Sequence, residues 1–155
     1  MAKIVVGVDA SVHSASALRW AAEEAKLRHA TLVAVHAWTF VPPPPIGEIG
    51  MPAISPTEIT SALEAERDAA RRLLDEVVDG VLGPDDGVER RLVEDTPADA
   101  LIAEASSADL LVVGGRGHGS IASVLLGSVS QYLAQHAPCP VVIVRASTAE
   151  RPDGR

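Results

Sequence analysis

A glycine-rich stretch, VVGGRGHGSIASVLLGSVSQ, runs from Val112 to Gln131 and begins inside a run of Leu and Val residues. Four of its glycines fall within the six positions from Gly114 to Gly119. Glycine has no Cβ, so successive backbone N–H groups can point toward one side of such a loop. A concave row of N–H groups binds phosphate oxygens. The stretch therefore predicts an anion site made by main chain; its alternative interpretation is a flexible turn.

A second anion-binding element is predicted where Gly127 and Ser128 open the last helix of the chain. The first N–H groups of a helix and its dipole favour an anion, and the hydroxyls of Ser128 and Ser130 are candidate donors. Nine residues separate Gly117 from Gly127, which leaves room for the segment SIASVLL to fold back. Both elements are thus expected to face one polyphosphate.

Charged side chains near these elements are further candidates. Asp9 ends the first apolar run, directly after Gly7 and Val8. Mg²⁺ takes one or two carboxylates together with phosphate oxygens, so Asp9 is a candidate ligand for a Mg²⁺ that accompanies a nucleotide; capping the first helix is its alternative role. Arg116 is a candidate to neutralise phosphate charge and His118 to approach a γ-phosphate, with a solvated loop position as the alternative for each. The other histidines show no metal-ligand spacing.

The elements that must position these residues are indicated by the hydrophobic pattern. Short β-branched runs, apolar on both faces, predict buried strands, and segments with apolar residues at helical spacing alternate with them. This order predicts an α/β fold, a doubly wound five-stranded parallel sheet with helices on both faces. Strands are predicted at Lys3–Asp9, Ala30–Trp38, Val88–Glu94, 108–115 and 139–145, and helices at 11–29 with Ser11 as N-cap, from Thr57 to Leu82, at 96–106 with Thr96 as N-cap and Pro97 at the first position, and at 128–137.

Ligands of doubly wound sheets bind at the carboxyl ends of the strands, where the winding direction reverses. The first and fourth strands are expected to be central and adjacent, so that Asp9 and the glycine loop face each other across a crevice. The strand from Val88 to Glu94 has a more polar pattern and is expected near a sheet edge.

The 155 residues are expected to form one nucleotide-binding domain over 1–146. The segment 41–56 contains six prolines and predicts a surface loop, either a lid over the site or a plain connection. The last residues, 147–155, predict a polar, frayed tail.

Composition narrows the possible partners and compartment. The net charge of −8 and the pI near 5.0 argue against nucleic acid or an acidic membrane as a partner. Cys139 is the only cysteine, so no disulfide can form within the chain and a reducing compartment is expected. The apolar run at the N-terminus is interrupted too early by Gly7 and Asp9 for a signal peptide. No apolar run in the sequence is long enough to span a membrane. A cytoplasmic protein is therefore expected.

Two common phosphate-binding motifs are absent from the expected places. No G-x-x-x-x-G-K-[ST] occurs, and the turn after the first strand reads GVDASV, which does not match G-x-G-x-x-G. The spacing Gly114-x2-Gly117-x9-Gly127-Ser128 does match G-x2-G-x9-G-[ST] without a gap. In this signature, in the opening IVVGVDAS…SALRWAAEEA and in the ending APCPVVIVR, the chain resembles the universal stress protein family from about Lys3 to Arg145.

The resemblance implies five parallel strands, a homodimer paired through the last strands, and a nucleotide held in the crevice. It implies that Val35 lies against adenine and that Val113 and Arg116 also line the nucleotide. Many family members have glycine where Ala10 stands. The resemblance also implies which positions surround the ribose and phosphates; in this chain they are Asp9, Gly114, Gly117, Gly127, Ser128 and Ser130. The full set of candidate nucleotide-binding residues is Gly7, Asp9, Val35, Val113, Gly114, Arg116, Gly117, His118, Gly119, Ser120, Gly127, Ser128, Val129 and Ser130.

The leading hypothesis is an ATP-binding regulatory protein of the stress response, acting through nucleotide-dependent conformation or dimerisation. Any ATP hydrolysis is expected to be slow, because no base is placed to activate water. A cyclic AMP-binding member of the same family is the first alternative. A phospho-acceptor receiver domain with Asp95 as acceptor is a further alternative, but it requires an acidic cluster after the first strand and a lysine after the fifth, where this chain has Asp9 and Arg145.

Overall fold

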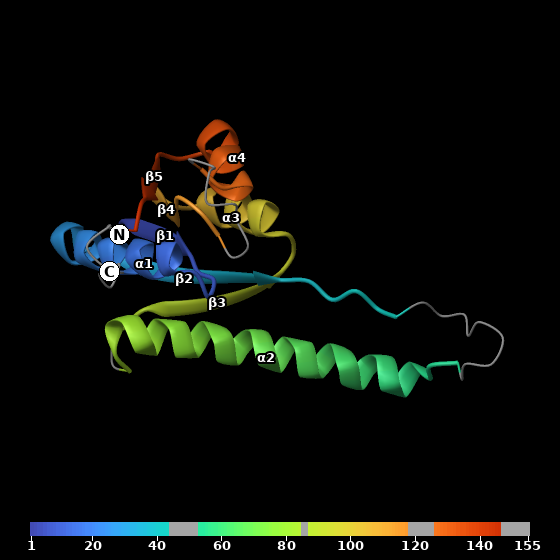
Figure 1. Ribbon diagram of the computed structural model, residues 1–155. Helices are drawn as coiled ribbons and strands as arrows, with labels where there is room; N and C mark the ends of the chain where they lie inside the picture. Colours follow the sequence, from blue (N-terminus) through green and yellow to red (C-terminus); the bar gives the residue numbers. More distant parts are fainter. Residues whose placement is uncertain (44–52, 85–86, 118–125, 147–155) are drawn as a thin grey trace, which may run out of the picture.

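Strands and helices alternate along the whole described chain. The computed structural model describes residues 1–43, 53–84, 87–117 and 126–146, and Figure 1 shows how its elements are arranged. The alternation of strands and helices confirms the predicted α/β fold. The elements are β1 (Lys3–Gly7), α1 (Val12–Arg28), β2 (Thr31–Trp38), α2 (Pro56–Leu82), β3 (Glu89–Glu94), α3 (Pro97–Ala105), β4 (Leu110–Gly114), α4 (Ser128–His136) and β5 (Val141–Val144).

The five strands form one parallel sheet in the order β3-β2-β1-β4-β5. β1 lies at the centre, with Ile4 beside Leu32 on one side and Leu110 on the other. The chain winds outward from β1 to β3 and then returns to β4, so the winding direction reverses between β1 and β4. This confirms that the first and fourth strands are neighbours and that the strand ending at Glu94 lies at an edge.

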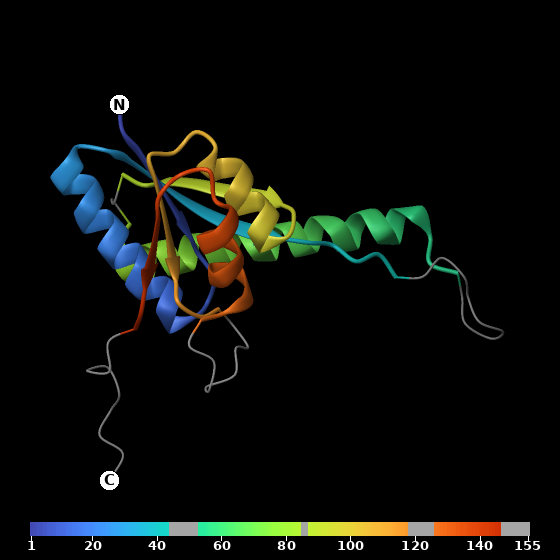
Figure 2. The same ribbon diagram turned by 90° about the horizontal axis from the view of Figure 1, so that it is seen from above.

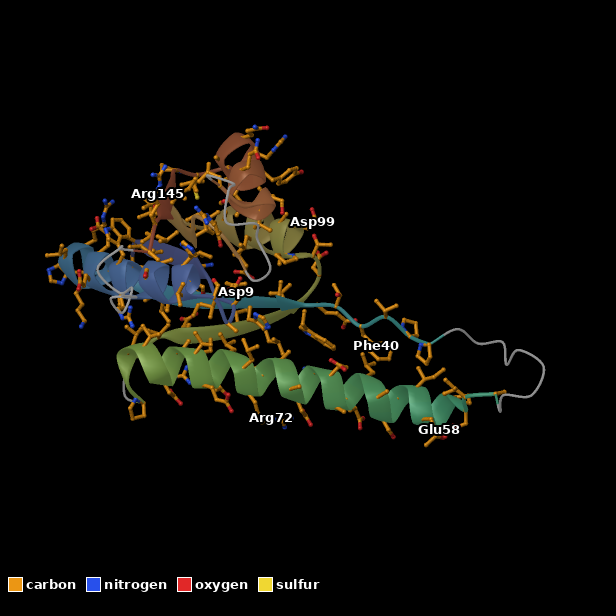
Figure 3. The ribbon with its side chains drawn as sticks, viewed as in Figure 1. Asp9, Phe40, Glu58, Arg72, Asp99 and Arg145 are labelled. Atoms are coloured by element: carbon orange, nitrogen blue, oxygen red, sulfur yellow. The ribbon has the colours of Figure 1, made fainter. Side chains whose placement is uncertain are left out.

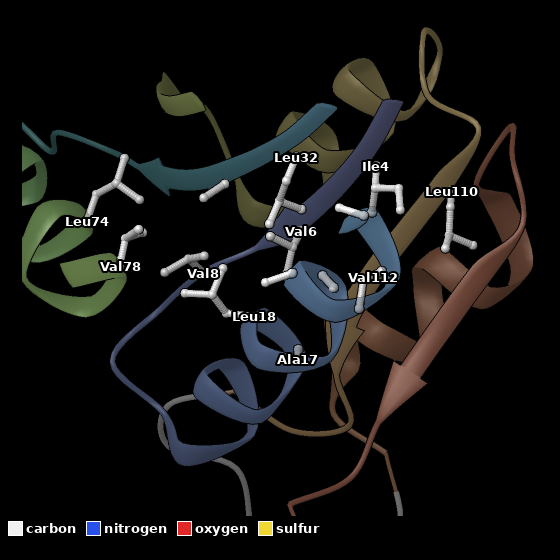
Figure 4. Packing of buried hydrophobic residues seen from close by; sticks show 14 residues of the cluster. Ile4, Val6, Val8, Ala17, Leu18, Leu32, Leu74, Val78, Leu110 and Val112 are labelled. Atoms are coloured by element: carbon white, nitrogen blue, oxygen red, sulfur yellow. The ribbon is translucent and has the colours of Figure 1, made fainter. Parts of the chain in front are cut away.

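Alternate residues of the strands pack against different helices. Ile4 and Val6 belong to a buried cluster that includes Leu18 of α1 and Leu74 of α2 (Figure 4). Val5, between them, belongs to a second cluster with residues of α3 and α4. The side-chain period of two along a strand thus places α1 and α2 on one face of the sheet and α3 and α4 on the other, as the view in Figure 2 also shows.

Side-chain caps fix where the helices begin. The hydroxyl of Ser11 accepts a hydrogen bond from the N–H of Ser14, and that of Thr96 accepts one from Asp99, with Pro97 in the first turn. These caps agree with the sequence predictions.

The start of α2 was predicted incorrectly. The helix begins at Pro56 and not at Thr57, and Ser55 is its N-cap. The Ser55 hydroxyl accepts from the N–H of Glu58, while the Glu58 carboxylate accepts from the N–H of Ser55. This reciprocal pair is a capping box, and proline is tolerated in a first turn because its missing N–H has no helical partner there. The end of the proline-rich segment is therefore helical, whereas 44–52 and the tail 147–155 lie outside the described residues.

β1 ends at Gly7, two residues before the predicted end at Asp9. Val8 still donates its N–H to the carbonyl of Val35, but the N–H of Asp9 donates to the Ser14 hydroxyl at 2.8 Å. Asp9 has therefore left the sheet and joins the start of α1.

Among the described helices, none combines the length and the apolar content that crossing a membrane requires.

The capping box predicts a measurable titration shift at Glu58. The N–H of Ser55 first, and its hydroxyl second, hold the pKa of the Glu58 carboxyl below its ordinary value. Because the folded-state pKa is lowered, the carboxylate favours the folded helix end above the unfolded-state pKa, and this contribution is lost as the pH falls through the folded-state pKa. Ser55→Ala removes only the hydroxyl, so we expect the pKa of Glu58 to rise part of the way in a carboxyl NMR titration. Ser61→Ala, on the exposed side of the same helix, should leave it unchanged.

Candidate functional site

A cavity of about 430 Å³ opens at the carboxyl ends of the central strands, where the winding direction reverses. The ends of β1, β2 and β4 form its floor, and the first residues of α1, α3 and α4 contribute to its walls. This is the place at which doubly wound sheets bind ligands. The lining residues are Gly7, Val8, Asp9, Ser14, Val35, His36, Ala37, Pro97, Leu101, Val113, Gly114, Arg116, Gly117, Gly127, Ser128, Val129 and Ser130.

Every predicted site residue that the structure describes lies in this lining. The predicted residues His118, Gly119 and Ser120 lie outside the described residues. The members brought together are Gly7, Asp9, Val35, Val113, Gly114, Arg116, Gly117, Gly127, Ser128, Val129 and Ser130.

Gly114 ends β4 where α1 passes very close to it. A Cβ on Gly114 would lie 2.7 Å from the carbonyl carbon of His13 and 2.9 Å from both its Cβ and its carbonyl oxygen. The imidazole Nδ1 of His13 also accepts a hydrogen bond from the N–H of Ala146, at 3.2 Å. The absence of a side chain at Gly114 therefore allows the first turn of α1 to pack against the ends of β4 and β5, which sets one wall of the cavity.

The two predicted anion-binding elements are joined directly by main-chain contacts. The N–H of Gly127 donates to the carbonyl of Gly115 at 2.7 Å. A Cβ on Gly127 would lie 3.3 Å from the Cα of Arg116, which is tighter than an ordinary contact. The start of α4 and the loop after β4 thus lie against each other beside one cavity.

Ser130 holds these two bends together. Its hydroxyl is within donating distance of the carbonyl oxygens of Gly115 (3.1 Å) and Gly127 (3.0 Å), and the residue is only 2% exposed. In this structure the hydroxyl proton is therefore directed at main-chain carbonyls, whereas the sequence suggested a donor to a ligand. Ser128, at the first position of α4, lines the same cavity.

Asp9 extends from the start of α1 toward the glycine loop. Its Oδ1 accepts a hydrogen bond from the N–H of Ser11 at 2.7 Å. Its Oδ2 lies 3.2 Å from the position that a Cβ on Gly117 would occupy. The carboxylate is thus part of the local structure that starts α1 and also reaches the loop; Figure 3 shows its position beside α1.

Several lining residues were missed by the sequence analysis, among them Ser14, His36, Pro97 and Leu101. Ser14 is 4% exposed, and its only sequence signal was its place one helical turn after the N-cap. Pro97 and Leu101 enter the lining because α3 packs against the end of β1, where a Cβ on Gly7 would lie 2.9 Å from Leu101 Cδ1. Such contacts depend on how the helices pack against the sheet, and local sequence patterns do not predict that packing.

The cavity has two chemically different ends. At one end, the first turn of α4 offers backbone N–H groups and the Ser128 hydroxyl, and Arg116 adds a cation, whereas the N–H groups of Gly115 and Gly127 already donate to main-chain carbonyls. Val35 and Leu101 give the other end apolar walls. The arrangement suits a ligand with an anionic group at one end and an apolar ring at the other.

The thiol of Cys139 lies outside this lining, just before β5. Burial raises its pKa above the ordinary thiol value, with a smaller contribution from the nearby Asp109 charge. A raised pKa favours the protonated, unreactive thiol. Within the described residues, no group of three or more His, Cys, Asp or Glu side chains is arranged to hold a metal ion.

Taken together, these features define a doubly wound α/β domain with a glycine-lined cavity at its switch point. The family model described as "Universal stress protein family" matches residues 1–145, and the chain belongs to that family. A universal stress protein of Mycolicibacterium smegmatis is 40% identical over 144 residues, covering 92% of this chain and 45% of the relative. The chain therefore spans about half the length of the curated relatives that it matches.

Solved structures of the same family share the fold. A universal stress protein crystallised in complex with cAMP is 32% identical, with a TM-score of 0.57, covering 94% of this chain and 98% of the other. A universal stress protein from Archaeoglobus fulgidus, solved in complex with dAMP, is 26% identical, with a TM-score of 0.50 and coverage of 93% and 98%.

Proposed function

We propose that this protein binds ATP in the crevice between β1 and β4, and that the bound nucleotide regulates its conformation or association in a stress response. The observation that carries the proposal is the contact between the glycine loop and the start of α4, made by Gly127 N–H and Gly115 C=O at 2.7 Å beside a cavity of about 430 Å³. The family relatives in complex with cAMP and dAMP support an adenine nucleotide as the ligand.

The proposed pose follows from the two ends of the cavity. The phosphates lie beside Gly117, Gly127 and Ser128, where the first turn of α4 and its dipole favour an anion. The predicted loop residues His118, Gly119 and Ser120 remain part of this proposal. A Mg²⁺ bound with the nucleotide would neutralise phosphate charge, and Asp9 is the carboxylate of the described lining that would hold it.

The apolar end of the cavity takes the adenine ring. Val35 and Val113 are almost completely buried strand residues that contribute to this end, and Leu101 closes it from α3. Ribose then lies between the two ends, near Asp9. The proposal is one of binding; any hydrolysis is slow.

Cyclic AMP is the second candidate ligand. It is favoured by the family relative solved with cAMP, at 32% identity over nearly the whole chain. A cyclic phosphate carries less charge and has no β- or γ-phosphate. Cyclic AMP would therefore make fewer contacts with the glycine loop and the start of α4 than ATP would. ATP and cyclic AMP can therefore be separated by direct titration.

We further propose a cytoplasmic homodimer paired through β5. The edge strand β5 is the uncharged sequence VVIV with all four residues partly exposed. The opposite edge, β3, carries Glu89, Arg90, Arg91 and Glu94, and charged side chains discourage pairing at an edge. The β5 edge is therefore the one suited to a second copy.

Gly117→Ala tests whether the loop binds the nucleotide. The new Cβ would lie 3.2 Å from Asp9 Oδ2, so the loop or the carboxylate must move, and we expect ATP affinity to fall about tenfold, equivalent to about 1.4 kcal/mol, in calorimetric titration. Gly80→Ala is the matched control, because its Cβ meets nothing within 4 Å. It should leave ATP affinity unchanged and stabilise α2 by about 0.5–1 kcal/mol.

The same titration is run with cyclic AMP, and small molecules released from the denatured purified protein are identified by mass spectrometry. Unchanged ATP binding in Gly117→Ala would contradict the loop assignment. Tighter binding of cyclic AMP than of ATP to the unmodified chain would replace ATP by the alternative ligand.

A further inference from the structure

A second cavity of about 410 Å³ lies beside the nucleotide crevice, between the end of β2 and α2. The two cavities share His36, Ala37 and Pro97, so they meet at a common wall. The lining of the second cavity is His36, Ala37, Trp38, Thr39, Glu66, Ala69, Ala70, Leu73, Asp95 and Pro97.

This cavity exists because α2 is longer than the sheet that it covers. The helix has 27 residues and is about 40 Å long. Leu74 and Val78 are fully buried and hold its second half on the sheet. Its first half extends past the sheet beside the segment that follows β2, where Phe40 is labelled in Figure 3. The space opens where helix and strand diverge.

Strand and helix periodicity explain which side chains face this space. His36 and Trp38 continue the alternation of Leu32 and Ala34, which pack on the α1 and α2 side of the sheet. On α2, Ala70 lies one turn before the buried Leu74, and Glu66 one turn before Ala70. The lining therefore borders the hydrophobic core, and its outer members Glu66, Ala69 and Asp95 are exposed.

His36 is fixed at the boundary between the two cavities. Its Nδ1 lies 2.8 Å from the carbonyl oxygen of Val8. A carbonyl oxygen only accepts hydrogen bonds, so Nδ1 carries the proton in this contact. The ring is thereby held with one edge against Val8, directly after β1, and it forms part of the wall that the two cavities share.

The pose of the proposed nucleotide places the far edge of its base at this wall, and the inference rests on that proposed function. With the phosphates at the start of α4 and the base beside Val35, the purine edge most distant from ribose faces Ala37 and Pro97. This edge carries the 6-amino group of adenine. A substituent on that amino group would pass His36 and enter the second cavity.

We propose that the second cavity is a subsite for a substituent on the 6-amino group of the adenine nucleotide. Trp38, Ala69, Ala70 and Leu73 supply an aromatic and apolar surface for an aryl or alkyl group. Glu66 and Asp95 are the charged residues of the described lining, which contains no Lys or Arg. The subsite therefore accepts neutral or cationic substituents and disfavours anionic ones.

The test is a calorimetric comparison of ATP with N6-benzyl-ATP on the full chain. We expect the two to bind with affinities within about threefold of each other, because the benzyl group occupies existing space. Ala70→Phe fills that space and should weaken N6-benzyl-ATP about tenfold or more while leaving ATP within about twofold. Ala69→Phe, at the adjacent lining position, is the second filling variant in case Ala70→Phe fails to fold.

Ala65→Phe is the matched control, since Ala65 is exposed on the same helix and outside the lining. It should change neither affinity. N6-(2-aminoethyl)-ATP should bind more tightly than N6-carboxymethyl-ATP, which has a similar size and the opposite charge. Binding of N6-benzyl-ATP about a hundredfold weaker than ATP, or filling variants that weaken both ligands equally or neither, would overturn the subsite while the proposed function stands. Absence of ATP binding would refute the proposed function, and the subsite with it.

Discussion

Gly114→Ala is expected to lower the free energy of unfolding by about 3 kcal/mol and to abolish most nucleotide binding, because the new Cβ overlaps main-chain atoms. The contacts are with the carbonyl carbon and oxygen of His13, at 2.7 and 2.9 Å, and neither can rotate away as a flexible side chain could. Relief requires α1 to move off the ends of β4 and β5. Since Ser14 and the start of α1 line the crevice, the same movement alters the ligand site.

The neighbouring glycine provides a matched control. A Cβ on Gly115 would have its nearest contacts at 3.6–3.7 Å, with Ile143, Val144 and Arg145, which are ordinary van der Waals distances. Gly115→Ala should therefore change stability by less than about 1 kcal/mol. Both variants are measured by urea denaturation and ATP titration. Equal stability of the two variants would show that α1 does not approach β4 as closely as described.

Leu18→Ala is expected to lower the free energy of unfolding by about 3 kcal/mol, since deleting a fully buried leucine removes apolar contacts and leaves a cavity. Leu18 is 0% exposed and belongs to the cluster formed by α1, α2 and the sheet (Figure 4). Its loss loosens both helices on that face.

Leu27, on the same helix, tests whether burial is the cause. It is 78% exposed, so Leu27→Ala makes the same chemical change with almost no packing loss. We expect a stability change within about 0.5 kcal/mol. Thermal and urea unfolding followed by circular dichroism measure both variants, and similar losses in the two would contradict the described packing of α1.

Most of the fold was predictable because its signals are local. Buried β-branched runs such as Lys3–Gly7 mark central strands, and Ser11 and Thr96 mark helix starts by side chains that accept their own helix N–H groups. The start of α2 was missed because the prolines before it were interpreted as loop. The serine and glutamate three residues apart, Ser55 and Glu58, were the signal that identifies the capping box.

The candidate site was predictable only in part. Gly114, Gly117 and Gly127 were predicted from the glycine-rich stretch and from their spacing, which matches the family signature, and all three line the cavity. Ser14 and His36 were missed because their contacts, with Asp9 and Val8, depend on how the loop between β1 and α1 folds against the start of α1 and against β2. The second cavity was equally inaccessible to pattern analysis, since it arises from the length of α2 relative to the sheet.

The adjacency of β1 and β4 has a consequence for how ligand and folding are coupled. Ile4 lies beside Leu110, so the crevice joins the beginning of the chain to its last third. Any fragment lacking either strand has no complete binding surface. A nucleotide bound there would consequently protect the entire sheet against proteolysis, and at a free concentration one hundred times its dissociation constant it would raise global stability by about 2.7 kcal/mol.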